Sequence, residues 1–234
     1  MSGDDRNQVV GVSRREFLRR TLVGGAGVAL SPALLGLRPE KLWAWLQPSI
    51  VVIVIHDNAT IGPNVNEPIV RLMLDAAIKE LTGQATVGDA WLSLFPGLTT
   101  SEVISTKVNC INSQLPSHPE VANCIANGLT QMQIGIETFP DNNIIIWDRT
   151  DSELTSSGYT INAGPTGVRC FGTNHSGVGY SSTSIDVAGV TSYPSRIVTD
   201  LCAHMISLAV LKNHSGPGIT LNLKNHYGSV NNPG

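Results

Sequence analysis

The sequence has few charged and few aromatic residues. Of its 234 residues, 14% are Asp, Glu, Lys or Arg and 5% are Phe, Trp or Tyr. A chain this poor in charge is unlike a disordered polyelectrolyte. A chain this poor in aromatic residues lacks the stacking platforms on which single-stranded nucleic acids bind. The length suffices for one good-sized domain with a buried core.

Cysteine is scarce as well, and no two cysteines form a CxxC pair. They are Cys110, Cys124, Cys170 and Cys202. Clustered zinc and iron–sulfur sites need closely spaced thiolates, so this spacing argues against such a site within this chain. Cys124 falls on the apolar face of a predicted helix and is expected to be a buried free thiol, although an oxidising compartment would permit disulfides.

Basic residues are concentrated at the N-terminus. Residues 1–38 contain six arginines and three acidic residues, so 9 basic and 15 acidic residues remain, for a net charge of −6. A mildly acidic domain does not attract a phosphate backbone, and no basic stripe is left to do so locally. Nucleic acid is therefore excluded as a partner.

The first 38 residues predict an export signal. Arg14 and Arg15 precede Phe17 and Leu18, and the stretch 21–37 is uncharged and moderately apolar. A basic start before an apolar core is typical of a targeting segment, and this core is shorter than the roughly 20 residues of a membrane-spanning helix. The run resembles the twin-arginine signal. That resemblance implies passage through the twin-arginine translocation machinery to the periplasm or another extracytoplasmic compartment, often with a cofactor inserted beforehand.

The predicted organisation is a signal segment at 1–38, a linker at 39–49 and a folded domain at 50–234. We expect cleavage near Ala33, and the alternative is an uncleaved leader that anchors the protein in the membrane.

The folded part alternates apolar runs with amphipathic segments. Strands are predicted at 50–55, 102–108, 143–147 and 205–211, with further candidates at 167–171 and 183–187. Helices are predicted at 66–81, 119–132, 152–157, 194–204 and from 219 onward, and 82–100 is predicted to be mainly loop. The alternation indicates an α/β fold with a largely parallel or mixed sheet and helices on both faces.

Polar clusters follow four of the predicted strands. They are His56-Asp57-Asn58, Lys107 with Asn109, Asp148-Arg149-Thr150 and Lys212-Asn213-His214. Ligands of parallel sheets bind beyond the carboxyl ends of the strands. We therefore expect a common site at that edge.

A short motif, Asn-His-(Ser/Tyr)-Gly, occurs three times. It lies at 174–177, 213–216 and 225–228, and a lysine precedes the second and third copies. Glycine backbone and polar side chains could bind a carboxylate or phosphate, with Lys107, Asn109, Lys212, Lys224 and Asn225 as the ligand-binding residues.

The same motifs permit other chemistry. His175, His214 and His226, with Asp148, could ligate a metal such as zinc or ferrous iron. His214, His226 and Asp148 could instead act as catalytic acids or bases. The alternatives without function are turns for the Asn-His motifs and a helix N-cap for Asp148.

Five segments together resemble a known family. They are residues 107–110 (KVNC), 117–120 (SHPE), 142–150 (NNIIIWDRT), 210–214 (VLKNH) and 223–228 (LKNHYG). These residues resemble the domain-of-unknown-function family numbered 362, over roughly residues 50–234. Because many members carry or accompany iron–sulfur ferredoxin modules, the resemblance implies redox or metal chemistry, but this chain has no ferredoxin cysteine pattern. Members also continue past the last motif, so a C-terminal truncation is expected.

Three functional hypotheses follow. The first is an exported enzyme, metal- or redox-linked, that acts on a small anionic substrate. The second is a non-catalytic protein that binds a carboxylate or phosphate ligand. The third is a subunit of a membrane redox complex. The cofactor is unknown at this point, and a metal ion is one candidate.

Overall fold

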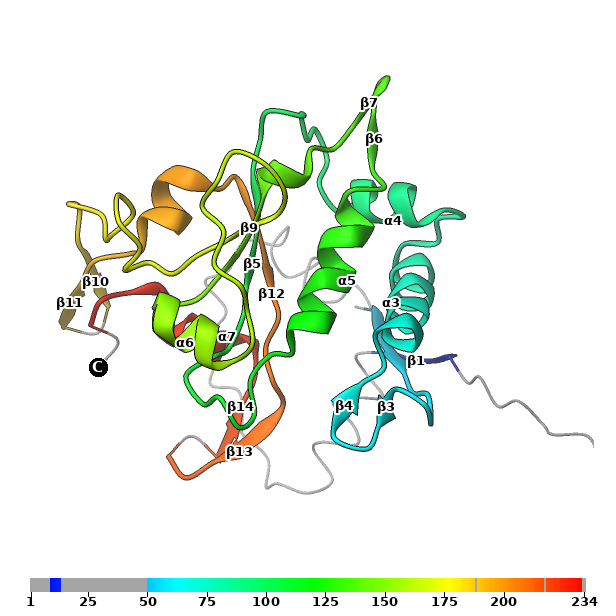
Figure 1. Cartoon of the computed structure of the whole chain (residues 1–234), viewed down its shortest axis with the longest axis horizontal. Coiled ribbons are helices and arrows are strands. Elements are labelled where there is room, and N and C mark those ends of the chain that lie inside the picture. Colours follow the sequence, from blue (N-terminus) through cyan, green and yellow to red (C-terminus); the bar gives the residue numbers. More distant parts are fainter. Residues whose placement is uncertain (1–8, 14–49, 188, 217, 233–234) are drawn as a thin grey trace, which may run out of the picture.

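A four-stranded parallel sheet forms the centre of the computed structural model (Figure 1). Its strands lie in the order β12 (His204–Ser207), β5 (Ile104–Lys107), β8 (Ile144–Trp147) and β9 (Arg169–Cys170). The structure describes residues 9–13, 50–187, 189–216 and 218–232. The predicted linker, and the signal segment apart from residues 9–13, lie outside these ranges. The predicted α/β class is confirmed.

The two central strands are buried throughout, which explains their composition. Every residue of β5 and of β8 is buried. A strand covered on both faces needs a continuous apolar run, as the three isoleucines of β8 provide. In the parallel register, Lys107 lies between Ser207 and Trp147, the last residues of the neighbouring strands. The segments that follow these strands therefore leave the sheet at one edge.

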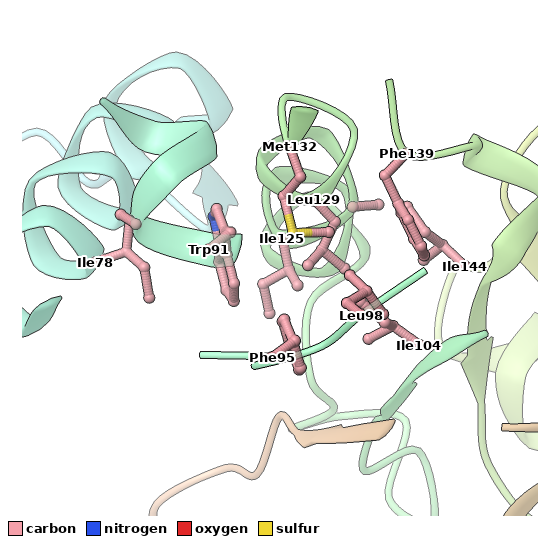
Figure 2. Close-up of a cluster of buried hydrophobic side chains, with 12 residues drawn as sticks. Ile78, Trp91, Phe95, Leu98, Ile104, Ile125, Leu129, Met132, Phe139 and Ile144 are labelled. Atoms are coloured by element: carbon pink, nitrogen blue, oxygen red, sulfur yellow. The ribbon is translucent and has the colours of Figure 1, made fainter. Parts of the chain in front are cut away.

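Helices cover one face of the sheet. α3 (Glu67–Thr82), α4 (Val87–Ser93) and α5 (Pro119–Leu129) contribute to a buried cluster with Ile104 and Ile144. Figure 2 shows these side chains meeting between the helices and the sheet. α6 (Asp151–Ser156) extends this layer, because its Leu154 packs in a cluster with Ile146.

The second face is covered by a π-helical turn, η3 (Ile197–Leu201), and by loops. Ile145 and Trp147 point to this face and pack with Phe171 and Ile197. The alternation between Ile144 and Ile146 on one face and Ile145 and Trp147 on the other follows the two-residue period of a strand.

The helix boundaries follow local sequence signals. α3 has Pro68 in its first turn and ends at Gly83, whose φ of 70° is left-handed and whose N–H donates to Lys79 O at 2.8 Å. Among the described residues, no helix combines the length and the apolarity needed to cross a bilayer.

All four cysteines are free, as expected for Cys124. Cys110, Cys124 and Cys170 are buried. Burial raises the pKa of Cys110 and of Cys170 to about 12, so both thiols remain protonated at neutral pH.

Two predictions about helices were wrong. Residues 82–100 contain α4, whose N-cap Thr86 accepts a hydrogen bond from Asp89 N at 3.1 Å. Within the segment 194–204, only Arg196 and the π-helical turn Ile197–Leu201 are helical, and His204 begins β12. Ala203 N donates to Val103 O at 2.9 Å, so pairing with the segment before β5 replaces the helical hydrogen bonds.

The predicted buried strand at 50–55 was also wrong in its placement. β2 (Ile50–Val54) pairs antiparallel with β1 (Val9–Ser13), outside the central sheet. Ile50 and Ile53 are exposed. An apolar run identifies a strand but not its neighbours, so His56-Asp57-Asn58 follows a strand that does not belong to the sheet.

The remaining strands form small hairpins outside the central sheet. The pairs are β3 (Thr60–Ile61) with β4 (Asn64–Val65), β6 (Gln133–Ile134) with β7 (Glu137–Thr138), β10 (Ile185–Val187) with β11 (Val190–Ser192) and β13 (Lys212–His214) with β14 (Gly218–Thr220). The last helix, α7 (Asn222–Asn225), begins later than predicted because β14 occupies residues 218–220. The 3-10 turns among the described residues are η2 (Asp141–Asn143) and η4 (His226–Ser229).

A substitution at Gly128 on α5 tests the packing between α4 and α5. A Cβ at this position would lie 2.2 Å from Trp91 Nε1, and Trp91 is buried. We expect Gly128→Ala to lower the free energy of unfolding by about 1–3 kcal/mol through overpacking, despite the higher helix propensity of alanine. Urea denaturation measures the loss. Asn123→Ala, at an exposed position of the same helix, is the control and should not destabilise. Equal stability of the two variants would contradict the close contact.

Candidate functional site

A pocket of about 380 Å³ opens at the carboxyl ends of β5 and β8. In Figure 1, the β13–β14 hairpin and α7 lie at this same end of the sheet. Most of the site residues predicted from the sequence line the pocket: Lys107, Asn109, Asp148, Lys212, His214, Lys224 and Asn225. Residues of three of the four polar clusters therefore line one pocket. The strand predicted at 205–211 ends at Ser207, so Lys212-Asn213-His214 forms β13 of a hairpin and does not directly follow a strand of the sheet.

A buried ion pair forms the base of the pocket. Lys107 and Asp148 are 1% and 4% exposed, and Lys107 Nζ donates to Asp148 Oδ1 at 2.6 Å. Lys107 Nζ also donates to Val108 O at 2.6 Å and lies 5.4 Å from the centre of the Trp147 ring. A buried lysine needs such partners, because an unpaired ammonium in a protein interior is costly.

Asp148 joins two of the loops that form the pocket. Its Oδ2 accepts from Cys110 N at 2.6 Å, and its Oδ1 also accepts from Arg149 N at 2.7 Å. The N-cap of α6 is Thr150 rather than Asp148, because Thr150 Oγ1 accepts from Glu153 N at 3.1 Å. With three protein donors on its carboxylate, Asp148 positions the loops after β5 and β8.

Asn225 connects α7 to the ends of two strands. Its Nδ2 donates to Lys107 O at 2.9 Å and to Ser207 Oγ at 3.0 Å, and the residue is 2% exposed. A carbonyl can only accept, so the orientation of this amide follows from its partner. Gly228 then passes so close to the ion pair that a Cβ would lie 3.1 Å from Asp148 Oδ1. The chain after α7 thereby covers the buried pair.

Two other lysines give the pocket its positive charge. Lys212 Nζ donates to Asn109 Oδ1 at 3.1 Å and to Leu115 O at 3.0 Å, and Lys224 Nζ lies 5.2 Å from the centre of the Tyr227 ring. Within the described ranges, neither lysine has a carboxylate within ion-pair distance. Burial, and to a smaller extent the charge of Lys224, lowers the pKa of Lys212.

The other charges that line the pocket neutralise one another. Lys107 pairs with Asp148, and Arg149, which precedes α6, pairs with Glu153 in the first turn of that helix. Lys212 and Lys224 therefore leave two positive charges in the pocket without a carboxylate partner in the part of the chain described.

His214 is the histidine that lines the pocket. Its Nδ1 accepts from Gly216 N at 3.0 Å. A neutral ring in this arrangement carries its hydrogen on Nε2, which is then a donor.

The other two candidate histidines are placed differently. His226 is not part of the pocket wall; its Nδ1 lies 3.2 Å from Ser229 Oγ, and burial followed by the charge of Lys107 lowers its pKa. His175 pairs with Asp151 Oδ2 at 2.7 Å and packs against the Phe171 ring, outside the pocket. The first Asn-His motif is a turn, since His175 N donates to Gly172 O at 3.0 Å.

The proposed set of metal ligands, His175, His214 and His226, does not line a common pocket. Among the described residues there is no group of three or more His, Cys, Asp and Glu side chains that could hold a metal ion. The cofactor of this protein is unknown.

Several residues of the pocket wall were not among the predicted site residues. They are Ile111, Asn112, Leu115, Glu153, Thr220 and Tyr227. The first three lie in the loop after β5, and the rule that ligands bind beyond the strand ends could have identified this loop. Thr220 has no such signal, because its position depends on the β13–β14 hairpin, where its Oγ1 donates to Val210 O at 2.9 Å.

Comparison with known proteins gives one match. A model of the family described as domain of unknown function (DUF362) matches residues 104–234, which is more than half of the chain. No curated protein and no solved structure matches. The matched region begins at β5 and contains the pocket residues described above.

The burial of the Lys107–Asp148 ion pair predicts how substitutions of the two residues change the free energy of unfolding. Lys107→Met leaves Asp148 charged and without its ammonium partner, and we expect a loss of about 3–5 kcal/mol in the free energy of unfolding. Lys107→Met/Asp148→Asn removes both charges and should be more stable than Lys107→Met alone. A double-mutant cycle by urea denaturation gives the coupling energy. Additive losses would show that the two side chains do not act as a pair.

Proposed function

This chain belongs to the DUF362 family, and from that premise we propose that it is an exported protein whose pocket binds a small molecule with a carboxylate or phosphate group. The observation that carries this proposal is the pair of lysines, Lys212 and Lys224, that line the pocket without a carboxylate partner in the described residues. The described acidic side chains of the pocket are already paired, so an anion from solution is the partner that these lysines accept.

The neutral donors of the pocket suit the same ligand. Lys212 Nζ is held by two neutral oxygens, those of Asn109 and Leu115, which orient the ammonium without cancelling its charge. An ammonium has three hydrogens, so an anion can take the third. The volume of about 380 Å³ falls in the usual range of small-molecule sites, roughly 300–1,000 Å³.

Export is supported by the sequence alone. Arg14 and Arg15 stand before Phe17 and an uncharged stretch, in the pattern of the twin-arginine signal. A pocket built from segments that are far apart in the chain forms only after the protein has folded, which is consistent with export of the folded protein.

A catalytic function of the same pocket is the second candidate, and His214 favours it. With Nδ1 accepting from Gly216 N, the neutral ring presents its Nε2–H as a hydrogen-bond donor that can stabilise negative charge developing on a bound substrate. The distinguishing measurement is His214→Gln. In a binding protein this change leaves ligand affinity within a few-fold, and in an enzyme it removes turnover while binding persists. Metal or redox chemistry and a place in a membrane redox complex remain hypotheses from the sequence.

The two lysines give the main test of the binding function. We expect Lys212→Met/Lys224→Met to weaken the binding of inorganic phosphate at least tenfold, because a hydrogen bond to a charged group contributes about 1.5–3 kcal/mol. Isothermal titration calorimetry of the full chain measures the dissociation constant. Lys79→Met, on α3 outside the pocket, is the control and should not change it. Binding that survives in the double variant would place the anion elsewhere.

The same titration has an expected pH dependence. Anion binding needs protonated Lys212, and the pKa of Lys212 lies below its usual 10.5 because of burial and the charge of Lys224. At alkaline pH the affinity therefore falls as the pH rises through this lowered pKa, at a lower pH than for a lysine with the usual value. Lys224→Met removes the repulsion and should move the midpoint of the loss upward. A midpoint that does not move would mean that the two ammonium groups do not interact.

Export is tested by conservative changes of the signal. Arg14→Lys/Arg15→Lys keeps the charge but removes the paired arginines, and we expect the protein to remain in the cytoplasmic fraction of a host with twin-arginine export. Arg19→Lys/Arg20→Lys, in the same segment, is the matched control and should be exported normally. Immunoblots of the cytoplasmic and exported fractions measure the distribution. Equal export of both variants would contradict the twin-arginine route.

A further inference from the structure

Two apolar side chains stand at the mouth of the pocket. Ile111 and Leu115 both line it, and they are 59% and 55% exposed. Exposed aliphatic side chains beside charged groups gain free energy when a ligand covers them. A bare inorganic anion would leave them in water.

The loop that carries these side chains is tied to the charged part of the pocket. Lys212 Nζ donates to Leu115 O at 3.0 Å. Within the loop, Leu115 N donates to Asn112 O at 3.1 Å and Gln114 N donates to Asn112 Oδ1 at 3.0 Å. One lysine therefore supplies a positive charge and holds the apolar wall next to it, so a single small molecule can contact both.

The charge of the pocket sets the charge of the ligand. Lys212 and Lys224 carry two positive charges with no carboxylate partner in the described residues. They are close enough that the charge of Lys224 lowers the pKa of Lys212. A singly charged ligand leaves one of these charges uncompensated, whereas a doubly charged ligand neutralises both.

We propose that the natural ligand is an amphiphilic dianion, a phosphate monoester or a dicarboxylate with a short apolar body, whose charges face Lys212 and Lys224 and whose body covers Ile111 and Leu115. This inference rests on the proposed anion-binding function and specifies its ligand. The apolar body separates it from free phosphate, and the charge separates it from a monocarboxylate.

Calorimetry with two pairs of probes tests both parts. Methyl phosphate against butyl phosphate tests the apolar body, and each buried methylene should improve affinity by about two- to fourfold. Methyl phosphate against dimethyl phosphate, which carries one charge, tests the dianion, and we expect at least tenfold weaker binding of dimethyl phosphate. A comparison of succinate with butyrate repeats the charge test for carboxylates. The dianion that binds with the higher affinity, methyl phosphate or succinate, identifies the head group of the ligand.

A double variant assigns the apolar effect to the loop. Ile111→Ser/Leu115→Ser should abolish the affinity advantage of butyl phosphate over methyl phosphate, which is measured within the same variant. Both side chains are exposed, so the fold should be retained. Ile136→Ser, at a fully exposed position in the turn between β6 and β7, is the control and should keep the advantage.

The outcomes separate this inference from the proposed function. Equal affinity for methyl and butyl phosphate, or for methyl and dimethyl phosphate, overturns the amphiphilic dianion, and the anion site stands if Lys212→Met still weakens binding. If none of the anions binds the full chain, the proposed function itself is wrong. The inference is supported if the preference for the longer alkyl chain disappears in Ile111→Ser/Leu115→Ser and the preference for the dianion disappears in Lys212→Met/Lys224→Met.

Discussion

The buried pair of Lys107 and Asp148 is the interaction on which the rest of the site depends. It joins the last residue of β5 to the first residue after β8, at 2.6 Å. Neither charge is stable alone in the interior, so each requires the other and the backbone groups around them. Those backbone groups belong to the loops that form the pocket, as the bond from Cys110 N to Asp148 shows. The ion pair that stabilises this part of the core therefore also determines the shape of the pocket.

The charges that stabilise the structure are distinct from the charges that face the pocket. The buried lysine is neutralised by its partner, whereas Lys212 and Lys224 lie nearer the solvent and are bordered by neutral oxygens or an aromatic ring. The whole chain has a net charge of −3. The two lysines of the pocket therefore have the opposite sign to the net charge of the chain.

Much of the sheet and most of the pocket could be predicted, because short-range patterns specify them. The isoleucine run of β8 identifies a buried strand, and polar residues directly after it must leave at the sheet edge. β2 and the segment 194–204 were misplaced because strand pairing depends on residues far away in the sequence, such as Val103 for Ala203. The histidines were over-interpreted for a related reason: a repeated tetrapeptide does not specify where its copies lie, and His175 pairs with Asp151 instead.

The bond from Asn225 to the backbone of Lys107 has a consequence for the order of assembly. It joins residues separated by 118 positions in the chain, whereas the pair of Lys107 and Asp148 spans 41. Contacts of longer sequence separation have a higher loop-closure entropy cost, which grows slowly with loop length, and they tend to form after local contacts. A chain emerging from the ribosome cannot close this pocket until α7 has been synthesised. Completion of the pocket would then report that folding of this region is complete.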